Sequence, residues 1–104
     1  MPGITSRSSR SEVLEAVKHN GGALYHASAA LKGDREIVLE GVKQNGNALY
    51  GYALRSATAA LKDDREIVLE AVKQNGYVLQ HASTALKDDR EILLEAVNQK
   101  GLAL

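Results

Sequence analysis

The chain has 104 residues, which is enough for one small domain with a modest core. Thirteen lysine and arginine residues balance thirteen aspartate and glutamate residues, so no net charge attracts nucleic acid or anionic lipid. The chain has no cysteine, which excludes disulfides, thiolate metal sites and cysteine nucleophiles.

The N-terminal segment, residues 1–8, is predicted to be a disordered tail. It has small and basic residues but lacks the apolar region of a secretory signal peptide. No segment of the chain approaches the roughly 20 apolar residues that span a bilayer. We therefore expect a soluble protein with no membrane or nucleic-acid partner, for which an intracellular location is favoured over secretion.

An internal repeat dominates residues 9–104, which we predict to be a single helical-repeat domain. The string D-R-E-I-V-L-E begins at Asp34 and again at Asp64, and D-R-E-I-L-L-E begins at Asp89. Alignment of the valine and glycine residues that follow adds a degenerate first copy near Ser11. The four copies cover residues 9–33, 34–63, 64–88 and 89–104.

Each repeat is predicted to contain two short helices. In repeat three, the apolar residues from Ile67 to Val72 fall on one face of a helix with 3.6 residues per turn. Asp63, with an acid three residues later, marks the start of this helix as an acidic capping box. Asn75-Gly76 marks its end, because glycine adopts the left-handed conformation that closes helices. A second helix runs from Leu79 to Leu86, and neither helix is long enough to be stable without its neighbours.

Repeat two is longer because the segment that begins its second helix is duplicated, with one copy from Gly46 and another from Gly51. We predict one long helix from about Asn47 to Lys62, in which the internal glycine costs about 1 kcal/mol. A kink or loop between the two glycines is the alternative.

Repeat four stops at Leu104, soon after Gly101, where its second helix should begin. The apolar face of its first helix is then uncovered, which is a solubility problem for a terminal repeat. Either the chain is part of a longer array or this end pairs with a second copy as a homo-oligomer. The residues expected to form that self-association surface are Ile92, Leu93, Ala96, Val97, Leu102 and Leu104.

These patterns predict an all-α protein: a short α-solenoid, or a right-handed stack of helix-pair repeats of about 25 residues, whose last repeat is incomplete. Residues 63–89, D-D-R-E-I-V-L-E-A-V-K-Q-N-G-Y-V-L-Q-H-A-S-T-A-L-K-D-D, resemble the repeat of the domain-of-unknown-function family 4116. The resemblance extends over nearly the whole chain after the tail. It implies a tandem helical array and brings no catalytic motif. The duplicated helix start and the incomplete last copy depart from the family's pattern.

Residues with ligand-binding chemistry have simpler explanations. His26 and His81 share one repeat position, but no histidine or carboxylate lies four residues later to complete a metal site. The pairs Asp63-Asp64 and Asp88-Asp89 supply oxygen ligands, yet they lie at helix starts, where capping explains them. The serines lack a supporting histidine and acid. We therefore predict no catalytic residue, no metal and no cofactor.

Four tyrosines cluster just after the glycines, where the second helices begin. Tyrosine at such places packs on neighbouring helices, but it is also favoured at interaction hot spots. An interaction surface would centre on Tyr50, Tyr52 and Arg55. Because tandem arrays act through extended surfaces, we expect a non-catalytic protein–protein interaction or scaffolding module with an unknown protein partner. The alternative is a small-molecule binder or enzyme with a groove at the irregular second repeat.

Overall fold

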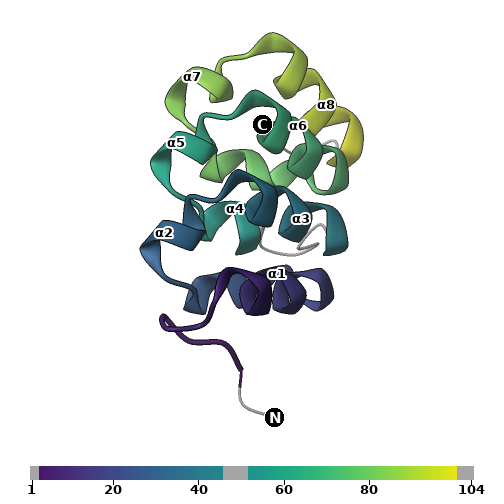
Figure 1. Ribbon diagram of the computed structural model, residues 1–104. Coiled ribbons are helices and arrows are strands. Elements are labelled where there is room, and N and C mark those ends of the chain that lie inside the picture. The colour runs from purple at the N-terminus through teal and green to yellow at the C-terminus, as the bar shows by residue number, and fades with distance from the viewer. Residues whose placement is uncertain (1–2, 46–51, 101–104) are drawn as a thin grey trace.

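The computed structural model describes residues 3–45 and 52–100, with the backbone alone for residues 44, 45, 52, 99 and 100, and all regular structure in these ranges is helical. In chain order the helices are α1 (Arg10–His19), the 3-10 helix η1 (Gly21–His26), α2 (Ala29–Lys32), α3 (Arg35–Asn45), α4 (Tyr52–Ser56), α5 (Ala59–Lys62), α6 (Arg65–Gln74), the 3-10 helix η2 (Gly76–His81), α7 (Thr84–Lys87) and α8 (Arg90–Lys100). Figure 1 shows α1, α3, α6 and α8 layered one above the next, with α2, α5 and α7 along one edge. The stack measures 40 × 23 × 15 Å, and no helix in its described part is long and apolar enough to cross a membrane.

Buried aliphatic side chains form one core that runs through the stack. The large side chains that are fully buried come from all four repeats: Val13, Val17, Leu24, Ile37, Val38, Val42, Leu54, Ile67, Val68, Val72, Val78 and Ile92. The predicted all-α helical repeat is therefore confirmed. In the N-terminal segment, Ile4 packs partly against this core, and the Ser8 N–H donates to the Thr5 carbonyl over 3.0 Å.

Helix α6 begins at a cap one residue later than predicted. Asp64 caps α6, because its side chain accepts a hydrogen bond from the Ile67 N–H at 3.1 Å. The prediction of Asp63 as the cap is wrong, since that residue closes α5. A reciprocal capping box is present in repeat one, where Ser9 and Glu12 each accept from the other's backbone N–H.

The Asn-Gly pair of repeat three ends α6, but with a different backbone conformation from the one predicted. Asn75 has extended backbone (φ −156°, ψ 109°), and its side-chain oxygen accepts from the Tyr77 N–H at 3.0 Å. Asn75 therefore closes one helix and caps the next. The predicted left-handed glycine is wrong, because Gly76 is the first residue of η2. Glycine is required there by packing: a Cβ would lie 2.4 Å from the carbonyl oxygen of Ala96 in α8.

The predicted second helix is in fact two short helices in each of the first three repeats. In repeat one, η1 ends at His26 and Ser28 caps α2 by accepting from the Leu31 N–H at 3.3 Å. Repeat three has the same arrangement, with Ser83 as the cap of α7. Ser83 was expected inside a continuous helix from Leu79 to Leu86, and it is instead the cap of a new helix.

In repeat two, the predicted continuous helix to Lys62 is wrong, because α4 ends at Ser56 and α5 begins at Ala59. The break occurs where the Thr58 N–H leaves the helical pattern and donates to the Lys32 carbonyl of repeat one over 3.2 Å. The Ser83 N–H makes the equivalent bond to Lys62 at 2.9 Å, so these bonds join successive repeats. The alternative of a kink or loop at residues 46–51 lies outside the described residues.

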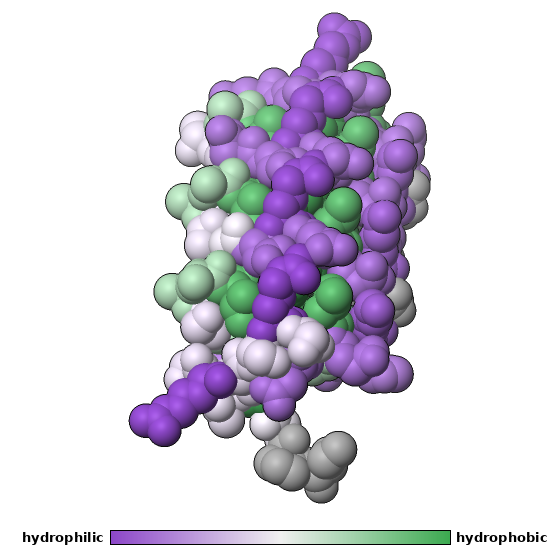
Figure 2. All heavy atoms as spheres, viewed as in Figure 1, coloured by the Kyte–Doolittle hydropathy of each residue, from purple (hydrophilic) through white to green (hydrophobic). Residues whose placement is uncertain are grey.

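A series of ion pairs, which we call the arginine ladder, joins the starts of the four long helices α1, α3, α6 and α8. Arg35 Nε lies 2.6 Å from Asp64 Oδ2, and Arg35 Nη2 also contacts Glu66. Arg10 and Arg65 make the same pairs with the repeat that follows each of them. In Figure 2 a hydrophilic band runs along the length of the stack, with hydrophobic residues beside it at each level.

The ladder shifts the ionisation of its members. Hydrogen bonding from the arginines holds the pKa of the ladder aspartates, which are Asp34, Asp64 and Asp89, below their ordinary value. The same bonds raise the pKa of each arginine. Because the arginine side chains are nearly half exposed, we infer that the ladder sets the register of the repeats more than it adds to stability.

Candidate functional site

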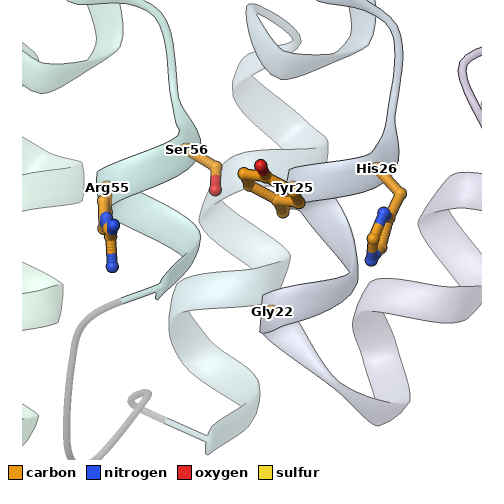
Figure 3. Close-up of a pocket in the computed structure, with 5 residues that line it drawn as sticks. All are labelled: Gly22, Tyr25, His26, Arg55 and Ser56. Carbon is orange, nitrogen blue, oxygen red and sulfur yellow. The ribbon is translucent and has the colours of Figure 1, made fainter.

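A hollow of about 350 Å³ lies between η1 of repeat one and α4 of repeat two. The residues that line it are Gly22, Tyr25, His26, Arg55 and Ser56. Figure 3 shows Tyr25 and His26 on η1, and Arg55 and Ser56 on the neighbouring α4. The hollow therefore belongs to the junction of two repeats, and neither repeat would form it alone.

The repeat pattern explains why these side chains face outward. In repeats one and two the two residues after the buried leucine lie at the surface, and these are Tyr25 and His26 in repeat one and Arg55 and Ser56 in repeat two. Gly22 holds the position at which repeats two and three carry tyrosine. We infer that the space exists here because repeat one has no side chain at that position.

The Tyr25 ring is exposed but restrained. Its exposed fraction is 68%, and Lys32 Nζ lies 5.3 Å from the ring centroid, in the range of a cation–π contact. The His26 ring meets it edge-on, with centroids 5.2 Å apart and planes at 86°. The Tyr25 ring therefore has Lys32 and His26 as neighbours, and Arg55 and Ser56 of α4 line the same hollow. The site can therefore receive an apolar side chain and hydrogen-bond a neighbouring carbonyl or carboxylate.

Several acidic residues take part in the architecture of the stack. Asp64 is both a helix cap and a ladder member, and Asp63 accepts from the Ser83 hydroxyl at 2.5 Å. Within the described ranges, no group of three or more His, Cys, Asp or Glu residues is placed to hold a metal ion.

The structure places one of the three predicted interaction residues in the hollow, namely Arg55. Tyr52 begins α4, but its side chain is outside the described part of the structure, as is the whole of Tyr50. Tyr25 and His26 were not predicted as site residues, since His26 was considered only as a metal ligand and rejected, and Tyr25 was one member of the tyrosine cluster. The signal that marks them in the sequence is the glycine at position 22, where the other repeats have tyrosine.

The apolar surface predicted for self-association is smaller than expected. Ile92 and Ala96 are fully buried, because α8 packs on α6 and η2. The prediction that these two residues are uncovered is therefore wrong. Leu93 and Val97 are half-buried. The two remaining members of the predicted set, Leu102 and Leu104, lie outside the described residues.

Comparison with known proteins identifies a family for this stack. The model of the family described as Domain of unknown function (DUF4116) matches residues 10–55, 49–87 and 64–104. Three overlapping matches along one chain agree with the tandem repeats of the structure. A search of curated proteins and a search of solved structures each gave no match.

Proposed function

The chain belongs to the DUF4116 family of domains of unknown function, and from its structure we propose that it is a non-catalytic protein–protein interaction module. The observation that carries the proposal is the restrained, exposed Tyr25 ring beside Arg55 in the hollow between repeats one and two. Tyrosine and arginine are the residue types that, together with tryptophan, contribute most binding energy at protein interfaces.

The restraint on Tyr25 favours binding. An interface side chain loses conformational entropy when it is immobilised, at a cost of about 0.5–1.5 kcal/mol for a flexible group. The contacts from Lys32 and His26 already limit the ring before a partner arrives. The ring therefore offers apolar contact area at a low entropic cost.

The chemistry of the hollow favours a segment of a protein that carries an acceptor group. Arg55 and His26 supply N–H donors on either side of the aromatic ring, and none of the lining residues that the structure describes carries a carboxylate. A partner segment with an apolar side chain next to an aspartate, a glutamate or a free backbone carbonyl would satisfy both features.

A small-molecule site is the second candidate, and the volume of the hollow supports it. About 350 Å³ is at the lower end of the range of ligand pockets. Such pockets bury most of their ligand's surface, however, whereas one wall of this hollow is a tyrosine with 68% of its surface in water. This geometry supports contact with a larger partner over enclosure of a small one.

Selection from a displayed library of random peptides tests the proposal. The purified chain is the target, and Gly22→Tyr, which we expect to fill the hollow, is the counter-target. Peptides that survive should bind the wild-type chain and lose roughly tenfold in affinity, or more, on Tyr25→Ala and on Arg55→Glu. Binding constants are measured by isothermal titration calorimetry.

Gln80→Ala is the matched control, because Gln80 is exposed and holds the position of Tyr25 in repeat three. Its affinity for the selected peptides should stay within about twofold of wild type. If no peptide distinguishes the wild-type chain from Gly22→Tyr, the hollow is not a protein-binding site. Small fragments that bind the hollow by NMR, and are lost in Gly22→Tyr, would favour the second candidate.

A further inference from the structure

The same asparagine–glycine pair follows two of the long helices. Asn20-Gly21 comes directly after α1, and Asn75-Gly76 comes directly after α6. A further copy, at residues 45 and 46, includes side chains outside the described part of the structure. Before a glycine, the main-chain nitrogen can attack the asparagine side-chain amide with little hindrance, because glycine has no Cβ. The two described pairs share this chemistry, so a difference in their reactivity must come from their surroundings.

The local geometry of the two asparagines is nearly the same. Asn20 has φ −154° and ψ 105°, and its Oδ1 accepts from the Gly22 N–H at 2.9 Å. Asn75 has φ −156° and ψ 109°, and its Oδ1 accepts from the Tyr77 N–H at 3.0 Å. Each main-chain carbonyl also accepts the N–H of the residue three positions later. Local hydrogen bonds therefore restrain the two asparagines in the same way.

Burial distinguishes the two copies. Asn75 has an exposed fraction of 1%, and a Cβ on Gly76 would lie 2.4 Å from the Ala96 carbonyl oxygen of α8. Asn20 is exposed. Its side-chain amide is open to water, and its hydrogen bonds can open when the end of α1 frays. A reaction at Asn75 requires in addition that the contact between η2 and α8 opens.

We propose that Asn20 is a site of spontaneous deamidation in the folded protein, and that the fold protects Asn75. The main-chain nitrogen of Gly21 attacks Cγ of Asn20 and forms a cyclic imide. The bond between Cγ and Nδ2 breaks, and Nδ2 leaves as ammonia with the proton of the Gly21 N–H. Water then adds to either carbonyl of the imide, which gives aspartate or isoaspartate. This chemistry needs no enzyme, and it does not depend on the proposed function.

The two products have different effects on the start of η1. Aspartate keeps the side-chain oxygen that accepts from the Gly22 N–H, and it is a favoured N-cap residue. Isoaspartate continues the main chain through its side-chain carbons, which lengthens the backbone by one carbon and removes the cap oxygen from its place. Because η1 begins at this cap and carries Tyr25, we expect the isoaspartate form to loosen one wall of the hollow.

Peptide mapping of the full chain tests the proposal, after prolonged incubation in buffer below its unfolding temperature. Cleavage after lysine places Asn20 in the fragment 19–32 and Asn75 in the fragment 74–87. Liquid chromatography with mass spectrometry separates the asparagine, aspartate and isoaspartate forms of each fragment. We expect Asn20 to convert roughly tenfold faster than Asn75, or more, because only Asn75 requires a contact between repeats to open. In urea, where the chain is unfolded, the two should convert at similar rates.

Asn20→Ser is the matched control, because serine keeps a cap oxygen and cannot form the imide. Incubation should lower the melting temperature of the wild-type chain more than that of Asn20→Ser, since isoaspartate forms at position 20 only in the wild type. The proposal is overturned if Asn20 stays intact in the folded chain while it converts in urea. It is also overturned if Asn75 converts as fast as Asn20 in the folded chain. Equal losses of melting temperature would refute the effect on η1.

Discussion

Gly76→Ala adds a single methyl group at a close contact between repeats three and four. The new Cβ would lie 2.4 Å from the carbonyl oxygen of Ala96, 3.1 Å from its carbonyl carbon and 3.3 Å from its Cα. All three atoms are backbone atoms of α8, so no side-chain rotation relieves the clash. Ordinary carbon–oxygen contacts are about 3.3 Å or longer, and α8 must therefore move away by roughly 1 Å.

That movement sets the size of the effect. Insertion of a methyl group into a well-packed contact costs about 1–3 kcal/mol, and a gap of 0.5–1 Å loses roughly a quarter to a half of the local dispersion energy. Since α8 is a whole helix that must shift, we expect a loss near 2 kcal/mol in the free energy of unfolding. In a chain of this length that corresponds to roughly 10 °C in melting temperature.

Urea unfolding followed by far-ultraviolet circular dichroism measures this loss, and hydrogen exchange shows whether α8 opens separately from the rest of the stack. Gly33→Ala is the control, because its Cβ would meet mainly the end of the Thr58 side chain, with Cγ2 at 3.2 Å. Repeats two and three carry aspartate at that position, so the backbone accepts a side chain. Equal stability of the two variants would refute the packing role of Gly76.

Three further predictions concern the caps and the ladder. Thr58 makes no side-chain cap bond, whereas the serines at the same position of repeats one and three do. Thr58→Ser should therefore raise the free energy of unfolding by about 0.5 kcal/mol, which a thermal melt measures. A decrease would mean that the methyl contact of Thr58 contributes more than the cap bond. Urea unfolding should give Asp64→Ala a free energy of unfolding about 1 kcal/mol lower than that of Asp64→Asn, because asparagine keeps the oxygen that accepts from the backbone of α6. Equal values for the two variants would contradict the capping role of Asp64. The ladder aspartates have a lowered pKa in the folded state, so their contribution to stability is present above about pH 4 and is lost as the pH falls through the lowered folded values. The urea midpoint should therefore fall on acidification below about pH 4, and Arg35→Gln should make that fall shallower; an unchanged slope would show that the ladder does not perturb the aspartate.

The long helices and the core could be predicted from the sequence because both depend on local periodicity. The second helices could not, since the spacing from Leu24 to Leu31 fits a continuous helix as well as it fits a 3-10 helix, a cap and one α-turn. In repeat two the residue at the break, Thr58, donates its N–H to the Lys32 carbonyl, and this partner lies in another repeat. The identity of Gly76 likewise depends on Ala96, twenty residues later in the chain.

Only part of the candidate site could be predicted from the sequence, because the hollow also depends on residues of two different repeats. Arg55 was recognised because it lies beside the duplicated segment, which is visible in the sequence. Tyr25 lies in the first repeat, away from the duplicated segment, and the hollow beside it depends on the side chain that position 22 lacks. A hollow formed by an absent side chain gives no motif, and it becomes visible when equivalent positions of neighbouring repeats are placed next to each other.

The hollow comes from a departure from the repeat pattern. Repeat one differs from its neighbours at Gly22, so a partner that binds the hollow will recognise one place in the stack. Gly22→Tyr gives repeat one the residue that repeats two and three carry at this position, and it should therefore abolish the interaction while leaving the stack folded.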